Sequence, residues 1–170
     1  MTTAEVASYN NPFLKGNNEP VYEEITTTEL EVIGEVPADI SGSFLRTGPN
    51  PYYVPDEARY HIFDGDGMIH GVNFKNGKVT YRNRFVQSKG LDEERAKGEW
   101  IYPGLNMLGE YIAKGEMPGV KNTGNTAMVF HQGQLYTMME GGTPYRISLP
   151  ELETEGEHDF EGTVTHNFTA

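Results

Sequence analysis

Apolar and polar residues alternate with a period of two along most of the chain, a pattern that predicts strands with one buried face. Met68–Phe74 and Val79–Val86 form a predicted hairpin around Asn76-Gly77, because both central residues of a type I′ turn need positive φ. Further strands are predicted at Ser43–Thr47, Arg59–Phe63, Ala127–Phe130, Leu135–Met139 and Tyr145–Leu149. Short strands at this regular spacing indicate an all-β fold of antiparallel meanders, as in a sandwich, barrel or propeller.

The segment between residues 91 and 120 departs from this alternation. Asp92–Lys97 has the composition of a helical turn, and Leu105, Leu108 and Ile112 recur at helical spacing. We therefore expect short helices between the two groups of strands.

The charge balance of the chain is strongly acidic. Its 170 residues include 13 Lys and Arg against 25 Asp and Glu, so the formal net charge is −12. Nucleic-acid binding needs a basic patch that displaces counterions from phosphate, and we therefore expect no nucleic-acid partner. The absence of Cys excludes disulfides, thiolate nucleophiles and cysteine-ligated metal sites.

The chain carries no recognisable targeting or membrane-spanning segment. Its first residues are polar and lack the basic region and apolar run of a secretory signal peptide. No stretch approaches the roughly 18 apolar residues of a transmembrane helix. The sequence thus predicts a cytoplasmic protein.

The histidines and the Asp64-Gly-Asp-Gly67 motif offer few signs of a metal site. The histidines do not form an HxH or HExxH motif, nor a pair at helical spacing. Asp64–Gly67 does not match the ligand positions of an EF-hand loop and is interpreted as a sharp hairpin turn. His61 and His70 fall on the two predicted strands of that hairpin and could approach each other, although a packed strand histidine is the ordinary alternative.

Glu140 is more informative, because it ends an otherwise apolar strand. An acid at such a place needs a partner, since an unpaired buried charge is costly. One candidate partner is a strand arginine, Arg82 or Arg84. The other is the N–H of a metal-bound histidine, which a neighbouring carboxylate orients.

Several motifs in a fixed order make the sequence from about residue 12 to residue 170 resemble the carotenoid cleavage oxygenase family, which includes carotenoid and apocarotenoid oxygenases and lignostilbene dioxygenases. The motifs are Leu30-Glu-Val-Ile-Gly-Glu-Val-Pro37, Gly42-Ser-Phe-Leu-Arg-Thr-Gly-Pro-Asn-Pro51, Phe63-Asp-Gly-Asp-Gly-Met-Ile-His70, Lys78-Val-Thr-Tyr-Arg-Asn-Arg-Phe-Val86, Asn125-Thr-Ala127, Met139-Glu-Gly-Gly-Thr-Pro-Tyr145 and Leu152-Glu-Thr154.

The resemblance implies part of a seven-bladed β-propeller with Fe(II) on its axis. In the family, four histidines bind the iron, three glutamates orient three of these histidines, and O2 is used to cleave a conjugated double bond. Residues 1–20 would be an irregular N-terminal lead-in. Residues 21–170 would be the N-terminal part of the propeller, with the β-prone end at Thr163–Ala170 stopping before the first iron-binding histidine.

The resemblance also assigns four residues of this chain. Glu140 matches a glutamate that orients an iron-bound histidine, and Thr126 matches a position beside the open coordination site of the iron. Phe63 and Met139 match positions that line the substrate cavity. No catalytic residue and no metal ligand is expected within the chain, so the fragment alone is expected to bind no iron and to be inactive.

The function implied for the full-length protein is Fe(II)-dependent dioxygenase cleavage of a carotenoid, apocarotenoid or stilbene-like substrate. The apolar residues gathered in 100–119 are expected either to contact a membrane peripherally at the substrate entry or to pack against the propeller. The alternative function, from another class, is a non-catalytic binding or structural module derived from a β-propeller.

Overall fold

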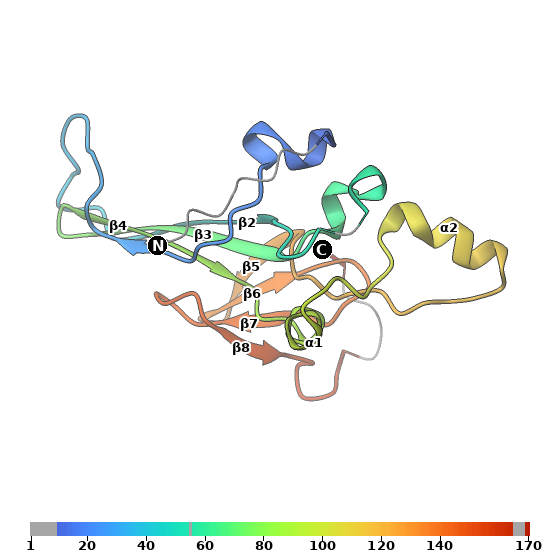
Figure 1. The fold of residues 1–170 in the computed structure, drawn as a ribbon. Helices are drawn as coiled ribbons and strands as arrows, with labels where there is room; N and C mark the ends of the chain where they lie inside the picture. The colour runs from blue at the N-terminus through green and yellow to red at the C-terminus, as the bar shows by residue number, and fades with distance from the viewer. Residues whose placement is uncertain (1–9, 55, 165–168) are drawn as a thin grey trace.

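The computed structural model describes residues 10–54, 56–164 and 169–170, and two four-stranded antiparallel sheets form its centre (Figure 1). The first sheet has the order β1-β4-β3-β2 and the second the order β5-β6-β7-β8. The strands are Thr26–Thr27 (β1), Gly42–Pro49 (β2), Gly67–Lys75 (β3), Lys78–Phe85 (β4), Ala127–His131 (β5), Gln134–Met138 (β6), Tyr145–Ile147 (β7) and Thr154–Glu157 (β8).

Helices connect and flank the sheets. The α-helices α1 (Lys89–Lys97) and α2 (Leu105–Ala113) lie between the two sheets in sequence, and α2 extends away from both sheets in space (Figure 1). The 3-10 turns are η1 (Pro12–Leu14), η2 (Gly16–Asn18), η3 (Glu57–Arg59) and η4 (Ile62–Asp64). The prediction of antiparallel meanders interrupted by helices is confirmed. Among the described residues, no helix has the length and apolar character needed to cross a membrane.

The predicted hairpin around Asn76-Gly77 is confirmed. Asn76 and Gly77 have φ of 53° and 72°, and Lys75 pairs with Lys78 across the turn. Positive φ at both central positions matches the twist of the two strands that the turn joins. This turn fixes the register of β3 against β4, and with it the face that each side chain of the hairpin presents.

The hydrophobic core lies between the two sheets. Its buried members come from β3 and the residue after β4 on one side, and from β6, β7 and the loop after β7 on the other: Ile69, Val86, Leu135, Tyr145, Ile147 and Leu152. Burial of such side chains is the main favourable contribution to folding. The two sheets therefore stabilise each other, although they are separated in sequence by the helical segment.

The predicted strand at Arg59–Phe63 is wrong, because this segment forms the 3-10 turns η3 and η4. The His61 ring accepts a hydrogen bond from the backbone N–H of Phe63 at 3.3 Å, and Asp64 accepts one from the N–H of His61 at 2.8 Å. Such local bonds from side chain to backbone compete with strand pairing.

The hairpin proposed for Asp64–Gly67 is wrong for the same reason, and His61 and His70 do not face each other. His70 lies in β3, where its Nδ1 is 2.8 Å from the Tyr81 hydroxyl of β4. The His61 ring instead packs against Phe13 and Phe63, with centroid separations of 5.4 and 5.3 Å.

The sequence analysis did not predict two of the strands, β1 and β8. One strand that it did predict lies partly outside the residues that the structure describes. The two-residue β1 and the polar β8, Thr-Glu-Gly-Glu, occupy outer edges of their sheets, where no apolar alternation is required. Half of the strand predicted for Thr163–Ala170, residues 165–168, lies outside the described residues, and for that half the strand stays a prediction. Of the described half, Thr163 lies in a turn, where its N–H donates to the Phe160 carbonyl at 3.2 Å.

Gly67 allows the start of β3 to approach the segment before β5. A Cβ at Gly67 would lie 2.5 Å from the Thr123 carbonyl oxygen and 2.9 Å from that of Gly124. We expect Gly67→Ala to lower the free energy of unfolding by about 1–3 kcal/mol, because backbone atoms must move to relieve the overlap. Urea unfolding of the purified protein measures this change.

Gly109→Ala is the matched control. Gly109 lies within α2, and a Cβ there meets no atom within 4 Å. Alanine should therefore raise stability by about 0.5–1 kcal/mol through its helix propensity. Equal unfolding midpoints for the two variants would contradict the close approach at Gly67.

Candidate functional site

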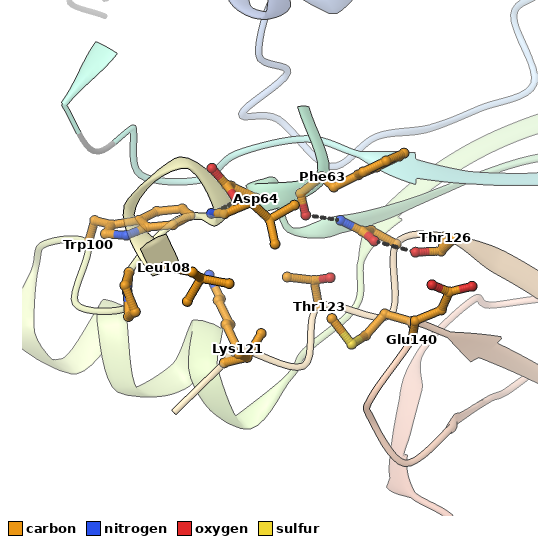
Figure 2. A pocket seen from close by; sticks show the side chains of 13 residues that line it. Phe63, Asp64, Trp100, Leu108, Lys121, Thr123, Thr126 and Glu140 are labelled. Atoms are coloured by element: carbon orange, nitrogen blue, oxygen red, sulfur yellow. Dashed lines mark hydrogen bonds between the residues drawn. The ribbon is translucent and has the colours of Figure 1, made fainter. Parts of the chain in front are cut away.

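A cavity of about 280 Å³ lies between α2, η4 and the ends of the strands in the second sheet (Figure 2). Apolar side chains form most of its wall: Phe63, Trp100, Pro103, Leu105, Leu108 and Met139. Figure 2 shows Trp100 and Leu108 on one side of the cavity and Thr126 and Glu140 on the other. A mostly apolar cavity with a few convergent polar groups is the usual form of a small-molecule site.

The structure brings the four residues assigned by resemblance into this one cavity. Phe63 comes from η4, Thr126 precedes β5, and Met139 and Glu140 follow β6. These positions are far apart in sequence, so their convergence is produced by the packing of the two sheets. Their functional roles remain predictions.

The carboxylate of Glu140 has no hydrogen-bond or ion-pair partner within the described part of the chain, and its side chain is exposed at the cavity. The arginine partners considered above are engaged elsewhere. Arg82 donates to the Thr26 hydroxyl at 3.1 Å, and Arg84 donates to the same hydroxyl at 2.8 Å. The arginine interpretation of Glu140 is therefore wrong for the described residues.

A hydrogen-bonded network holds Thr126 at the cavity wall. The side chain of Asn125 is buried, and its Nδ2 donates to the carbonyl oxygens of Phe63 at 3.0 Å and Gly65 at 2.6 Å. The Thr126 hydroxyl donates to Asn125 Oδ1 at 3.0 Å. One amide thus connects the turn that carries Phe63 to the side chain of Thr126.

Asp64 attaches α2 to the cavity. Gly104 at the start of α2 supplies no side-chain cap, and Asp64 Oδ1 accepts the N–H of Leu105 at 2.8 Å instead. Its Oδ2 accepts the N–H of His61. A carboxylate at a helix N-terminus satisfies a free donor and interacts favourably with the helix dipole. Asp64 thereby fixes Leu105 and the rest of the first turn of α2 over the cavity.

A buried cluster of charges lies against the same cavity. Lys121 Nζ is 2.5 Å from Asp66 Oδ1 and 2.6 Å from Glu94 Oε2, and all three side chains are at most 4% exposed. The Lys121 ammonium also lies 5.0 Å from the centre of the Trp100 ring. Burial raises the pKa of Glu94 above its usual range, and the attraction of Lys121 partly opposes this shift.

Sequence analysis did not identify Asp64, Asn125 or the Lys121 cluster as parts of the site. Asn125 belongs to one of the family motifs, yet only its neighbour Thr126 received a role. The partners of Lys121 lie 27 and 55 residues away in sequence, as the ion pairs show. No periodicity within one element can reveal such a contact.

The described residues do not supply a metal site of their own. No group of three or more His, Asp or Glu side chains within the described ranges could hold a metal ion. His166 lies outside those ranges. The described residues alone therefore could not hold a metal ion at this cavity.

The segment 100–119 has both an inward and an outward side. Trp100, Leu105 and Leu108 line the cavity, whereas Ile112 is 62% exposed and Met117 is 86% exposed. The expected packing against the rest of the protein is therefore found only for the residues that line the cavity. Contact of the exposed residues with a membrane stays a prediction.

The structure is thus a β-meander protein with a mostly apolar cavity. Comparisons with known proteins assign the chain to a family. The family described as retinal pigment epithelial membrane protein matches residues 18–170. A carotenoid cleavage oxygenase of Mycobacterium tuberculosis is 38% identical over 174 residues, which cover 100% of this chain and 32% of the relative. The chain belongs to the carotenoid cleavage oxygenase family, as its motifs predicted.

Solved structures agree with this assignment. The lignostilbene dioxygenase of Pseudomonas brassicacearum matches with a TM-score of 0.78 and 31% identity, over 94% of this chain and 33% of that chain. The cobalt-substituted apocarotenoid oxygenase of Synechocystis matches with a TM-score of 0.71 and 29% identity, over 85% of this chain and 31% of that chain. The chain spans about a third of the length of the relatives it matches.

We expect Lys121→Met to lower the free energy of unfolding by about 3–5 kcal/mol, because it leaves Asp66 and Glu94 buried without a counter-charge. Lys89→Met is the matched control, since Lys89 pairs with Glu157 and its side chain is 76% exposed. Exposed pairs contribute about 0–1 kcal/mol. Similar unfolding midpoints for the two variants would show that the buried cluster is not ionised as described.

Proposed function

We propose that the whole protein is a non-haem Fe(II)-dependent dioxygenase that uses O2 to cleave a conjugated double bond of a carotenoid, apocarotenoid or stilbene-like substrate. The observation that carries this proposal is the convergence of Phe63, Thr126, Met139 and Glu140 on one apolar cavity. Family membership and the names of the relatives support the reaction class.

The iron in this proposal is held by histidines outside the described residues. Four such ligands would leave coordination positions open for O2, and the bound iron would supply the activation of O2. A metal site in the apocarotenoid oxygenase relative, solved with cobalt, supports a metal in the family. The described residues contribute the wall of the site and its orienting carboxylate.

Glu140 is the proposed orienting carboxylate. It presents its oxygens at the cavity without a partner among the described residues, so it is free to accept the N–H of an imidazole supplied by another part of the protein. Such a bond fixes the tautomer and the ring orientation of a metal-bound histidine. Glu140 is thus a positioning residue and does not itself touch the reacting atoms.

In this proposal the apolar wall of the cavity binds the hydrocarbon part of the substrate. Phe63, Trp100, Leu108 and Met139 offer a surface that a polyene or stilbene can cover, with release of water from both. Asp64 holds α2 in place as part of this wall. The ordering of the first turn of α2 therefore shapes the entry to the substrate site.

Glu140→Gln keeps the shape of the side chain and removes its charge. We expect the folded whole protein to lose iron affinity or cleavage rate by about 10–100-fold, as is typical when a carboxylate behind a metal-bound histidine is lost. Glu140→Ala should lose more, because it also leaves an N–H unpaired. Iron content after anaerobic Fe(II) loading, cleavage rate and Tm are measured on one preparation.

Glu151→Gln is the control, because Glu151 is an exposed acid that does not line the cavity. It should leave iron content and rate unchanged. If Glu140→Gln retains full iron content and rate, Glu140 has no part in the metal site. A folded wild-type protein that takes up no iron and cleaves neither a carotenoid nor a stilbene would favour the non-catalytic module instead.

We also propose that the outward part of segment 100–119 contacts a membrane surface. Ile112 and Met117 present exposed apolar side chains near the α2 wall of the cavity, where an apolar substrate would leave a lipid phase. Replacing both with Ser should lower co-sedimentation of the whole protein with liposomes several-fold, because less apolar surface enters the interface.

The matched control is Ile33→Ser, in the loop before β2, where the side chain is 96% exposed. Its co-sedimentation should equal that of the wild type. Ile112 and Met117 are chosen because neither lines the cavity, so cleavage of detergent-solubilised substrate should persist. Unchanged liposome binding of the double variant would refute the membrane contact.

A further inference from the structure

Polar contacts hold the helix α2 in its place over the cavity. None of its nine residues is buried, so apolar packing contributes little to its position. In its first turn, the Leu105 N–H donates to Asp64 at 2.8 Å. The Asn106 side chain donates to the carbonyl of Arg59 at 3.0 Å, and the Arg59 guanidinium pairs with Glu110 at 2.5 Å.

The partners of α2 belong to one short stretch, residues 57–64, which we call the turn segment. It comprises the 3-10 turns η3 and η4. Arg59 and Asp64 lie near its two ends, and both contact α2. The position of α2, and with it the α2 wall of the cavity, therefore depends on what holds the turn segment.

Residues 11–14, the N-terminal segment, bind the turn segment directly. The Asn11 side-chain amide donates to the carbonyl of Glu57 at 2.8 Å and to that of Tyr60 at 2.9 Å. The Asn11 N–H donates to the Glu57 carboxylate at 3.0 Å. Leu14 is 1% exposed and anchors the N-terminal segment in the protein.

A ring contact adds to these hydrogen bonds. The Phe13 ring meets the His61 ring edge-on, with the centroids 5.4 Å apart, and such pairs contribute beyond their buried area. The His61 N–H in turn donates to Asp64 Oδ2 at 2.8 Å. The other oxygen of Asp64 holds the first turn of α2, so the N-terminal segment is two contacts away from the helix.

We propose that Asn11 is a positioning residue of the substrate site, which holds α2 over the cavity through the turn segment. Without its side chain, two carbonyls of the turn segment lose their donors, and the carbonyl and carboxylate that hold α2 are no longer fixed. The N-terminal segment thus acts on the cavity wall, although the sequence gives it the character of an irregular lead-in. The consequence for substrate binding rests on the proposed function.

Hydrogen exchange of the whole protein, followed by mass spectrometry, tests the attachment of α2. In Asn11→Ala the helix should detach more often, so peptides covering residues 104–113 should exchange about 3–10-fold faster, in line with the typical contribution of one hydrogen bond. Peptides covering residues 134–147 in the second sheet should exchange at the wild-type rate. A variant that is merely less stable would accelerate both.

Binding of an apolar probe without O2 tests the consequence for the substrate site. The probes are all-trans-retinol and trans-4-hydroxystilbene, whose Kd values are measured by fluorescence titration. Asn11→Ala should raise the Kd of the probe that the wild type binds by about 3–10-fold, because Leu105 and Leu108 leave the cavity wall part of the time. Iron content should not change, because Asn125 holds the Phe63 carbonyl independently.

A double-mutant cycle shows whether Asn11 acts through the turn segment. Asn106→Ala removes the bond between α2 and the Arg59 carbonyl directly, and it should also accelerate exchange in 104–113. Because both changes weaken one attachment, the double variant should exchange more slowly than the product of the two single effects. Effects that simply multiply would overturn the proposed route.

Asn18→Ala is the matched control. Asn18 lies in the same lead-in, and its side-chain amide donates to the Pro12 carbonyl at 3.3 Å, within the lead-in itself. Exchange in 104–113 and the Kd should equal those of the wild type. If Asn11→Ala fails to fold, Asn11→Ser carries the test. Serine can still cap η1 by accepting the Phe13 N–H, but it is too short to reach the carbonyls of the turn segment.

A folded Asn11 variant with wild-type exchange in residues 104–113 would overturn the inference. Faster exchange there with an unchanged Kd would overturn the role in substrate binding. Failure of the proposed function gives a different result. A wild-type protein that binds neither probe and cleaves no polyene or stilbene would refute the dioxygenase, whereas the exchange of α2 would still decide whether Asn11 holds the helix.

Discussion

The contact between the start of β3 and the segment before β5 is the constraint on which the site depends. Here Lys121 binds Asp66, the Gly67 N–H donates to the Thr123 carbonyl at 3.0 Å, and Asn125 reaches the carbonyl of Gly65. Buried polar groups are costly unless they have partners, so these contacts favour the observed packing of the two segments. The cavity forms beside this contact.

The same contact explains why the cavity is apolar although charged residues surround it. Asp64 and Lys121 both border the cavity, yet their charges are directed to a helix N-terminus and to two buried carboxylates. A charge satisfied within the protein offers little to a ligand and does not draw water into the site. Glu140 differs from both, because it reaches the cavity without a partner among the described residues. The position of its carboxylate is thus the strongest local indication of a function.

The sequence predicted those parts of the structure that local rules determine. The Asn76-Gly77 hairpin and the helical segment around Leu105 followed from turn chemistry and periodicity, which act within a few residues. The strand predicted at Arg59–Phe63 failed because His61 and Asp64 bond to the nearby backbone, and apolar alternation carries no information about such bonds. Edge strand β8 was missed because an outer strand can be polar on both faces.

The candidate site shows the same division between local and long-range information. Resemblance to a family located Phe63, Thr126, Met139 and Glu140, and the structure gathered them in one cavity. Resemblance gave no role to Asn125, because its effect arises from three hydrogen bonds that span 62 residues of sequence at most. Those bonds hold the Thr126 side chain at the cavity wall. The placement of Thr126 therefore depends on a neighbour that only the folded chain brings into position.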